Sequence, residues 1–482
     1  MIALSLTTTA DLNKPETKLA DIIELRLDLM NLNNFSLYSF PVLYKMPIIY
    51  TLRSTSQGGK FKFDKKQFIE IILKLKPRKT DYIDIELNKN YNSIIKVLRA
   101  KNINSKILLS SHSKILDLNH TPNLNKETAS QISALKFIYQ GKNSTDNFKV
   151  LANIKKLKNK YKKNIISFCM GETSNISRIL CLSYGSKWTY ASINQEKKTA
   201  QGQVDIKKLT DIYSIKRLKP KAKLYGLIGN PVEQSLGYVL FNYLFHKYGI
   251  NGIYVPILVK SSLEFRDLID RIKNLELRFF GLSITTPYKK LIINYFKSTN
   301  FESVNTVSVK NKNVFCDNTD NYALECFLKK IKDLSKKKIA ILGAGAVASS
   351  FVKALNNRSL EITLFNRTLE KAKLLEKRYN ILVKPLFDIK AHDFDILINC
   401  TSVGIIYKGF PFSLPALNNK IIIELNYRPI ETPLIKLAKK GKNNIIFDGL
   451  DFFIYQGLKQ FELFTGHKVR YTKQIRKMLC KY

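Results

Sequence analysis

The sequence predicts an α/β protein with two unlike halves, an N-terminal (β/α)8 barrel and a C-terminal two-domain α/β unit that contains a Rossmann domain. Short β-rich runs alternate with helical stretches over the first two hundred residues, which is typical of parallel strands joined by crossover helices. In the second half, a strand-like run at 338–342 leads into a glycine-containing loop and then a helical run. A Lys-rich linker at 211–221 separates the two halves.

The N-terminal half contains eight strand-like runs. They are residues 2–6, 22–27, 48–52, 82–87, 107–109, 134–138, 165–169 and 189–193. Stretches of helical composition, such as 65–75 and 147–158, lie between most of them. Eight such repeats within about 210 residues predict a (β/α)8 barrel at the small end of its size range.

Composition describes an ordinary globular chain with a basic charge. The 482 residues are 45% hydrophobic and 24% charged, and 80 Lys and Arg against 38 Asp and Glu give a formal net charge of +42. The basic residues are mostly Lys, scattered from end to end, and the nucleic-acid-binding motifs that would accompany a basic patch are missing. The charge favours anionic partners without choosing among nucleic acid, a membrane surface and small anionic substrates, and the missing motifs lead us to expect no specific nucleic acid partner.

The six cysteines and the lack of a long apolar run predict a cytoplasmic protein without a membrane segment. The cysteines form no CxxC pair and no metal-like cluster, so we expect free thiols in a reducing compartment and no metal site. No apolar run reaches the ~18 residues of a membrane span, and the first residues read as a strand without a charged leader.

Polar residues recur where the strands of the predicted barrel end. Because a barrel brings the carboxyl ends of its strands to one mouth, these residues are expected to face one another there. The candidates are Glu24, Arg26, Arg53, Glu86, His112 and Lys136, followed by Arg178 and Gln203 in later loops.

These candidates predict an imine-forming lyase that acts on a small hydroxylated keto acid. Lys136 lies inside a strand, where desolvation lowers the pKa of an amine and leaves it free to attack a carbonyl. His112 can move protons near neutral pH. Arg26, Arg53 and Arg178 can hold a carboxylate and hydroxyl groups.

The N-terminal half resembles type I 3-dehydroquinate dehydratase over roughly residues 1–210. The motifs that carry the resemblance are Glu24-Leu25-Arg26-Leu27-Asp28, Thr51-Leu52-Arg53 with Gly58-Gly59, Ser110-Ser111-His112, Lys136, Cys169-Met170-Gly171 with Ser177-Arg178, and Thr199-Ala200-Gln201-Gly202-Gln203. One departure is Gln57, because the family often carries Glu before the paired glycines.

The resemblance implies a role for each of these residues. Lys136 would form the imine with the C3 ketone, and His112 would remove a C2 proton and help expel the C1 hydroxyl. The substrate carboxylate would be held by Arg178, Thr199 and Gln203. The ring hydroxyls would contact Glu24, Arg26 and Arg53.

The second half carries a dinucleotide-binding pattern. The strand-like run 338–342 leads into Gly343-Ala344-Gly345-Ala346, where glycine lets the backbone approach a pyrophosphate at a helix N-terminus. A second strand-like run, 361–365, ends in Asn366-Arg367-Thr368 instead of an acidic residue. Because Arg suits the 2′-phosphate, the expected cofactor is NADP, as NADPH.

Further motifs around this unit are similar to shikimate dehydrogenase, over roughly residues 223–470. They include 281–289, Val304-Asn305-Thr306, Asn318-Thr319-Asp320, Tyr427-Arg428-Pro429 and Asp448-Gly449. The resemblance implies that Lys289 and Asp320 form the catalytic pair and that Gly449 lies near the nicotinamide. It implies that the substrate is surrounded by Ser235, Thr285, Asn305, Tyr427 and Gln456.

The family's His-Ser-x-Ser-Pro reads Gln234-Ser235-Leu236-Gly237-Tyr238 in this chain, so one expected hydroxyl near the substrate carboxylate is missing. A hydrogen bond to a charged group contributes ~1.5–3 kcal/mol, which predicts a raised KM. Phe452 stands where Met is common in the family.

Together the two resemblances imply consecutive steps of the shikimate pathway, with 3-dehydroquinate, 3-dehydroshikimate and shikimate as the small-molecule substrates. The expected domains are residues 1–213 for the barrel, 222–322 completed by 448–482 for substrate binding, and 323–447 for the Rossmann domain. Two alternatives stay open: a reductase half that acts on quinate or is impaired, and a basic nucleic-acid-binding protein with relic catalytic folds.

Overall fold

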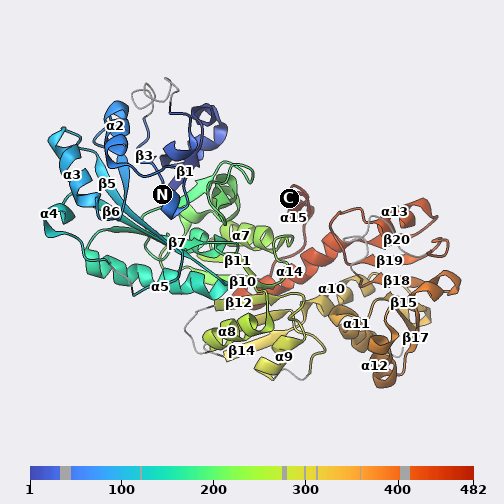
Figure 1. Ribbon diagram of the computed structural model, residues 1–482. Helices are drawn as coiled ribbons and strands as arrows, with labels where there is room; N and C mark the ends of the chain where they lie inside the picture. Colours follow the sequence, from blue (N-terminus) through green and yellow to red (C-terminus); the bar gives the residue numbers. More distant parts are fainter. Residues whose placement is uncertain are drawn as a thin grey trace. The chain divides into compact units, whose positions relative to one another are not determined.

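A computed structural model of the protein describes residues 1–32, 45–119, 122–273, 279–297, 300–310, 313–358, 360–401 and 413–482 (Figure 1). The chain divides into two compact units. Unit 1 comprises Met1–Leu224 and Asn242–Arg278, and unit 2 comprises Tyr225–Phe241 and Phe279–Tyr482. Among the described helices, none is both long enough and apolar enough to cross a membrane.

Unit 1 is built on a curved sheet of parallel strands in the order β7-β6-β5-β4-β3-β2-β1-β8-β9. The strands are β1 (Ile2–Leu6), β2 (Ile22–Arg26), β3 (Ile48–Thr51), β4 (Tyr82–Glu86), β5 (Lys106–Ser113), β6 (Ile132–Gln140), β7 (Asn164–Met170), β8 (Thr189–Ser192) and β9 (Val204–Asp205). All eight predicted strands are confirmed, and their order confirms the predicted barrel-type fold. Just before β8, the Lys187 amide donates to the Ile165 carbonyl of β7 at 2.8 Å.

Helices follow the later strands of this sheet. They are α2 (Lys65–Leu75), α3 (Tyr91–Ala100), α4 (Lys126–Ala129), α5 (Ser144–Tyr161) and α6 (Asn175–Leu180). The first of them shows why: Asp64 caps its N-terminus by accepting the Gln67 amide at 2.7 Å, and Phe68, Ile72 and Leu75 form one buried face. Between β1 and β2 the chain forms 3₁₀ turns instead. Unit 1 also contains β11 (Gly252–Leu258) and α8 (Ser262–Lys273).

The expected linker at 211–221 is partly packed. Ile212, Tyr213 and Ile215 are buried, because apolar residues at a spacing of three continue from Leu209 and give this stretch an apolar face. The ordered part of unit 1 therefore extends into the stretch that the sequence marked as a connection.

Unit 2 contains a sheet in which β10, β12, β13 and β14 are neighbours in that order. The elements of unit 2 around this sheet are β10 (Lys223–Gly229), β12 (Phe279–Ile284), β13 (Thr306–Lys310), β14 (Asn313–Asp317), α9 (Leu291–Phe296), α10 (Thr319–Leu328), α14 (Gly449–Thr465) and α15 (Lys473–Leu479). Helix α7 (Gly237–Lys247) begins in unit 2, and its residues from Asn242 onward belong to unit 1. Helix α14 returns to this sheet from the C-terminal end of the chain. Ser283 of β12 donates to Gln460 Oε1 at 2.7 Å, and Gln460 Nε2 donates to the Asn305 carbonyl at 3.0 Å.

The rest of unit 2 is a parallel sheet in the order β17-β16-β15-β18-β19-β20. Its strands are β15 (Ile339–Leu342), β16 (Ile362–Asn366), β17 (Leu382–Pro385), β18 (Ile396–Asn399), β19 (Ile421–Glu424) and β20 (Ile445–Phe447), with helices α11 (Ala346–Asn356), α12 (Leu369–Tyr379) and α13 (Pro433–Lys440). The order reverses between β15 and β18, which is where doubly wound sheets bind dinucleotides. The predicted Rossmann domain is confirmed.

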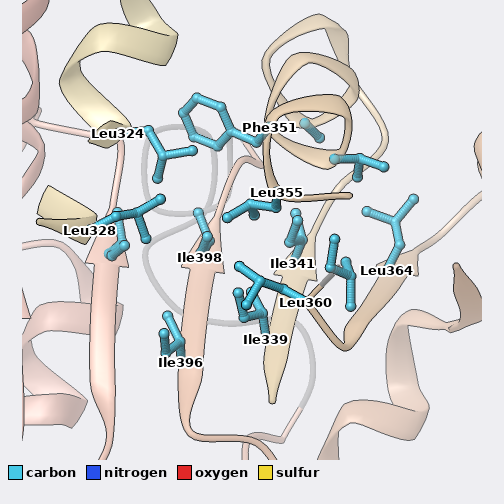
Figure 2. Close-up of a cluster of buried hydrophobic side chains, with 14 of the residues drawn as sticks. Leu324, Leu328, Ile339, Ile341, Phe351, Leu355, Leu360, Leu364, Ile396 and Ile398 are labelled. Carbon is cyan, nitrogen blue, oxygen red and sulfur yellow. The ribbon is translucent and has the colours of Figure 1, made fainter. Parts of the chain in front are cut away.

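A buried apolar cluster fixes α11 on this sheet (Figure 2). Phe351 and Leu355 of α11 lie over Ile341 of β15 and Ile398 of β18, and Leu324 of α10 joins the same cluster. All five side chains are fully buried. The helix that follows the glycine loop is therefore held rigidly against the sheet, with its N-terminus at the carboxyl edge of β15.

Candidate active sites

Unit 1 holds a cavity of about 210 Å³ at the carboxyl ends of its strands. The structure brings eight of the nine predicted residues of this half together in its lining: Glu24, Arg26, Arg53, His112, Lys136, Arg178, Thr199 and Gln203. The ninth, Glu86, does not line the cavity, because its carboxylate is bound to Arg53 and to the Ser54 amide. The parallel register accounts for this arrangement, since Glu24 of β2 lies beside Ser5 of β1, and Lys136 of β6 lies beside Ser110 of β5.

Lys136 lies at the centre of the buried charges in this cavity. Its Nζ is 3.6 Å from Glu24 Oε1 and 3.5 Å from Asp84 Oδ2, and it lies 4.1 Å from the centre of the Tyr190 ring. Burial lowers the pKa of Lys136, although the carboxylates of Glu24 and Asp84 oppose the shift. The side chain is thus a desolvated amine held in place by acids on two sides.

Asp84 is a part of this site that the sequence analysis missed. It is fully buried and accepts from Arg53 Nη2 at 2.6 Å, and the positive charges of Arg53 and Lys136 keep its pKa below the usual value despite burial. Arg53 also donates to Glu86 Oε1 at 3.1 Å. Strand alternation in β4 puts Asp84 on the same side as Glu86, and this signal could have identified it.

His112 is half-buried and lies beside Gln57. The Gln57 Oε1 atom lies 3.1 Å from both the backbone nitrogen and Nδ1 of His112. Burial lowers the pKa of His112 well below its usual value, and the nearby Arg53 and Lys136 charges lower it further. The imidazole is therefore neutral at pH 7, as a general base must be.

Arg178 is a buried cation that forms no ion pair with a described residue. Its Nε has no hydrogen-bond partner in the described structure, and its guanidinium lies 4.4 Å from the centre of the Phe168 ring. Burial lowers the pKa of Arg178 to about 10. A buried, unpaired guanidinium that lines a cavity is suited to bind a carboxylate.

The loop after β8 lies beside Arg178 in the lining of the cavity. Thr199 donates to Gln203 Oε1 through its amide at 2.8 Å and through its hydroxyl at 3.2 Å. Arg26 donates to the Thr199 carbonyl at 3.3 Å while its Nε and Nη2 bind both oxygens of Asp28 at 2.9 and 2.8 Å. The loop and the arginine thus hold each other in position.

In unit 2, Lys289 and Asp320 form a close ion pair. Lys289 Nζ lies 2.6 Å from Asp320 Oδ2, and both side chains are mostly buried. Lys289 follows β12, and Asp320 lies in the first turn of α10, whose cap is Asn318. Negative charge is favoured at a helix N-terminus, so the backbone supports the carboxylate.

Four of the residues predicted to surround the substrate form hydrogen bonds in the structure. Asn305 Oδ1 accepts the Thr319 amide at 2.9 Å, and the Thr319 hydroxyl lies 3.4 Å from Gln456 Oε1. Tyr427 is hydrogen-bonded to Ser235, and burial raises the pKa of its phenol.

Thr285, the remaining predicted substrate residue, lies in the turn after β12. It packs so closely on Gly229 at the end of β10 that an added Cβ there would lie 2.2 Å from its methyl group. The turn that carries Thr285 is therefore fixed against the end of β10, four residues before Lys289 in the chain.

The glycine loop after β15 leaves the N-terminus of α11 open. Gly343 has a φ of +96°, and no side chain caps the helix at Gly345, where an added Cβ would meet open space. The Ala344 amide donates to Asn366 Oδ1 at 3.2 Å, and Arg367 beyond it is exposed without an ion pair to a described residue. A helix N-terminus without a side-chain cap, open space beside it and an exposed arginine suit a phosphorylated dinucleotide.

Gly449 begins α14 in contact with the backbone of the preceding loop. A Cβ at this position would lie 2.1 Å from the Asn426 carbonyl oxygen. Only glycine therefore allows the start of α14 to approach the loop after β19 this closely.

Comparisons with known proteins agree with both halves of the chain. Family models match in order along it: type I 3-dehydroquinase at residues 4–220, the shikimate dehydrogenase substrate-binding domain at 227–307, shikimate/quinate 5-dehydrogenase at 325–406, and the shikimate 5′-dehydrogenase C-terminal domain at 449–477.

Relatives match over the whole chain and over its second half. The shikimate biosynthesis protein AroDE of Chlamydia pneumoniae is 30% identical over 456 residues, which cover 92% of this chain and 90% of that protein. The chloroplastic bifunctional 3-dehydroquinate dehydratase/shikimate dehydrogenase of Arabidopsis thaliana is 27% identical over 93% of this chain and 78% of its own length. The NADP(+) shikimate dehydrogenase of Pyrococcus furiosus is 36% identical over 52% of this chain and 92% of its own length. The chain belongs to the family of bifunctional 3-dehydroquinate dehydratase/shikimate dehydrogenases.

Proposed function

We propose that the chain catalyses two consecutive reactions, the dehydration of 3-dehydroquinate in the barrel and the reduction of 3-dehydroshikimate to shikimate by NADPH in the second half. The observation that carries this proposal is the pairing of a desolvated Lys136 with a neutral His112 in one cavity, in the same chain as the Lys289–Asp320 ion pair. The proposed domains are residues 1–213 for the dehydratase barrel, 222–322 with 448–482 for substrate binding in the reductase, and 323–447 for NADP binding. The six free cysteines agree with a cytoplasmic location.

In the dehydratase reaction, Lys136 attacks the C3 ketone and water leaves as the imine forms. The neutral His112 removes a proton from C2, and the electron pair moves into the imine to give an enamine. His112 then returns the proton to the C1 hydroxyl, which leaves as water while the ring double bond forms. Hydrolysis of the imine releases 3-dehydroshikimate and the free amine. Gln57 orients the imidazole through Nδ1.

Substrate binding in the barrel follows from the charges of the cavity. The unpaired Arg178 holds the carboxylate together with Thr199 and Gln203. Ring hydroxyls contact Glu24, Arg26 and Arg53. Arg26 is anchored by the buried carboxylate of Asp28, and Arg53 by that of Asp84. The two arginines therefore present donors in fixed directions and lose little conformational freedom when substrate binds.

In the reductase reaction, Lys289 donates a proton toward the carbonyl oxygen and Asp320 orients the ammonium group. Ser235, Thr285, Asn305, Tyr427 and Gln456 surround the substrate. The cofactor is held by Gly343, Ala344, Gly345 and Ala346 at the pyrophosphate and by Asn366, Arg367 and Thr368 at the phosphorylated ribose. When bound, NADPH would supply the hydride, and Gly449 would lie near the nicotinamide.

Reductive trapping tests the dehydratase. The protein is incubated with 3-dehydroquinate and sodium borohydride, and the adduct is located by mass spectrometry of peptides. We expect one adduct, on Lys136, and none in Lys136→Met, a variant that preserves much of the side-chain length without the amine. An adduct on another lysine, or none in an active enzyme, would overturn the imine mechanism.

Cofactor and substrate preference test the reductase. We expect oxidation of shikimate with NADP to exceed oxidation with NAD, and to exceed oxidation of quinate with either cofactor. Arg367→Asp should raise the KM for NADP and leave that for NAD little changed, because Arg favours the 2′-phosphate. Faster turnover of quinate with NAD would instead identify the second half as a quinate dehydrogenase.

A further inference from the structure

Three successive residues at the start of α10 contact three different parts of unit 2. Asp320 pairs with Lys289, and Thr319 donates to Asn305, one of the residues proposed to surround the substrate. Asn318 instead contacts Ser350 of α11, the helix that follows the glycine loop. The first two contacts belong to the proposed reductase site, whereas the role of the third is unassigned.

The Asn318 side chain is buried, and both its nitrogen and its oxygen form hydrogen bonds. Its Nδ2 lies 2.9 Å from each of three acceptors, the Ser303 carbonyl, Ser303 Oγ and Ser350 Oγ. Its Oδ1 accepts the Asp320 amide at 3.1 Å. One amide group therefore connects α11 directly to the backbone of Asp320.

Ser303 provides a second connection to the same helix. Its hydroxyl lies 3.2 Å from the Ala346 carbonyl, at the first residue of α11, and 2.8 Å from Ser350 Oγ. Ser303 and Ser350 are both buried, so these groups have no access to bulk water as alternative partners. If α11 shifted, buried polar groups would be left unsatisfied, and the arrangement resists such a shift.

The helix on the other side of this network cannot adjust independently. Phe351, next to Ser350, is packed in the apolar cluster over β15 and β18 (Figure 2). The position of Ser350 is thus set by the same packing that sets the glycine loop at the N-terminus of α11. The network relates the position of Asp320 to that loop.

We propose that Asn318 and Ser350 form a positioning bridge through which the cofactor-binding helix α11 holds Asp320 against Lys289. The bridge makes the proton-transfer geometry depend on the element that binds the cofactor pyrophosphate. This inference rests on the proposed reductase function and extends it to two residues that touch neither substrate nor cofactor.

Adjacent serines on α11 provide a matched test. Ser350→Ala removes the direct hydrogen bond between Asn318 and α11 and leaves the Ser303 contact with the Ala346 carbonyl. Among the described residues, the Ser349 hydroxyl donates to the Gly345 carbonyl within its own helix, so Ser349→Ala is the control. Asn318→Ser keeps an N-cap oxygen but removes the Nδ2 donor. The full-length variants are assayed for NADPH affinity, for kcat and KM with 3-dehydroshikimate, and for the primary isotope effect with NADPH deuterated at the transferred hydrogen.

We expect Ser350→Ala and Asn318→Ser to lower kcat roughly three- to tenfold, the value of one buried hydrogen bond. The KM for 3-dehydroshikimate and the NADPH affinity should stay within about twofold, and the isotope effect should be no smaller than in wild type, since the chemical step is the one slowed. Ser349→Ala should resemble wild type.

Equal kcat values in Ser350→Ala and Ser349→Ala would overturn the bridge. It would also be overturned if Ser350→Ala weakened NADPH binding while kcat stayed unchanged, because the serine would then shape only the cofactor site. Failure of the proposed function has a different signature, since wild type itself would then fail to reduce 3-dehydroshikimate.

Discussion

Gln57 Oε1 lies 3.1 Å from His112 Nδ1. A neutral amide at this distance fixes the direction of the imidazole ring without adding the negative charge that would stabilise its protonated form. The pKa of His112 therefore stays well below its usual value, lowered first by burial and then by the surrounding arginines and lysine. His112 is therefore neutral at pH 7, the state in which the proposed base of the dehydratase accepts a proton.

This arrangement predicts the response of the dehydratase to pH. The base works when it is neutral, so activity falls as pH drops through its pKa. Gln57→Glu places a carboxylate at Nδ1, raises that pKa and moves the acid limb of kcat/KM to higher pH. Gln57→Met, which removes the hydrogen bond without adding charge, should lower kcat without this upward shift. An unchanged limb in Gln57→Glu would show that another group limits the rate.

Removal of Arg178 should weaken substrate binding but raise the thermal stability of the barrel. Arg178→Gln loses a charged hydrogen bond to the substrate carboxylate, so we expect the KM for 3-dehydroquinate to rise roughly ten- to a hundredfold. The same change removes a buried, unpaired cation, so the barrel should unfold at a higher temperature. Steady-state kinetics and thermal unfolding test the two effects. A variant that loses stability would indicate that Arg178 has a structural partner.

Gly237 should limit substrate affinity in the reductase. Its backbone amide donates to Ser235 Oγ at 3.1 Å, and it does not adopt a positive φ, so a side chain is compatible with its backbone. Gly237→Ser supplies a second hydroxyl beside Ser235 and should lower the KM for 3-dehydroshikimate about tenfold or more. Gly237→Ala controls for the added Cβ. If both variants have the same KM, the added hydroxyl does not reach the carboxylate.

Glu424 should make the Rossmann domain sensitive to pH. It is completely buried at the end of β19, where Thr432 Oγ1 donates to it at 2.8 Å and the Asn426 amide at 2.9 Å. Burial raises its pKa to about 7 from 4.5. Its stabilising contribution is therefore complete below pH 4.5 and is lost as pH rises through 7, by roughly 3 kcal/mol.

Hydrogen exchange of residues 421–440 in wild type and Glu424→Gln tests this effect. The free energy of opening in wild type should fall relative to that of the variant between pH 4.5 and 8. A difference between the two proteins that does not depend on pH would contradict the titration of Glu424 in this range.

Local patterns were sufficient to predict most of the fold. Each barrel strand is a short apolar run, and the glycine loop between β15 and α11 lies in its expected strand–loop–helix context. The packed part of the expected linker was less predictable, because the burial of Ile212 and Ile215 depends on the surface that they cover.

The candidate sites were predictable only in part, because several of their contacts join residues that are distant in sequence. Arg53 was expected to contact substrate hydroxyls, and the sequence did not indicate that Asp84 and Glu86 of another strand anchor it. The hydrogen bond between Asn318 and Ser350 joins residues 32 positions apart. No spacing rule relates such a pair, and only the packing of α10 beside α11 brings it together.

The most direct test of the whole account is the loss of NADPH absorbance after 3-dehydroquinate is added to the pure full-length protein. Wild type should consume NADPH, whereas Lys136→Ala and Lys289→Ala should not consume it. Addition of 3-dehydroshikimate should restore only Lys136→Ala. If wild type is silent with 3-dehydroquinate but active with 3-dehydroshikimate, the dehydratase assignment is wrong, and silence with both substrates would contradict the two-step account.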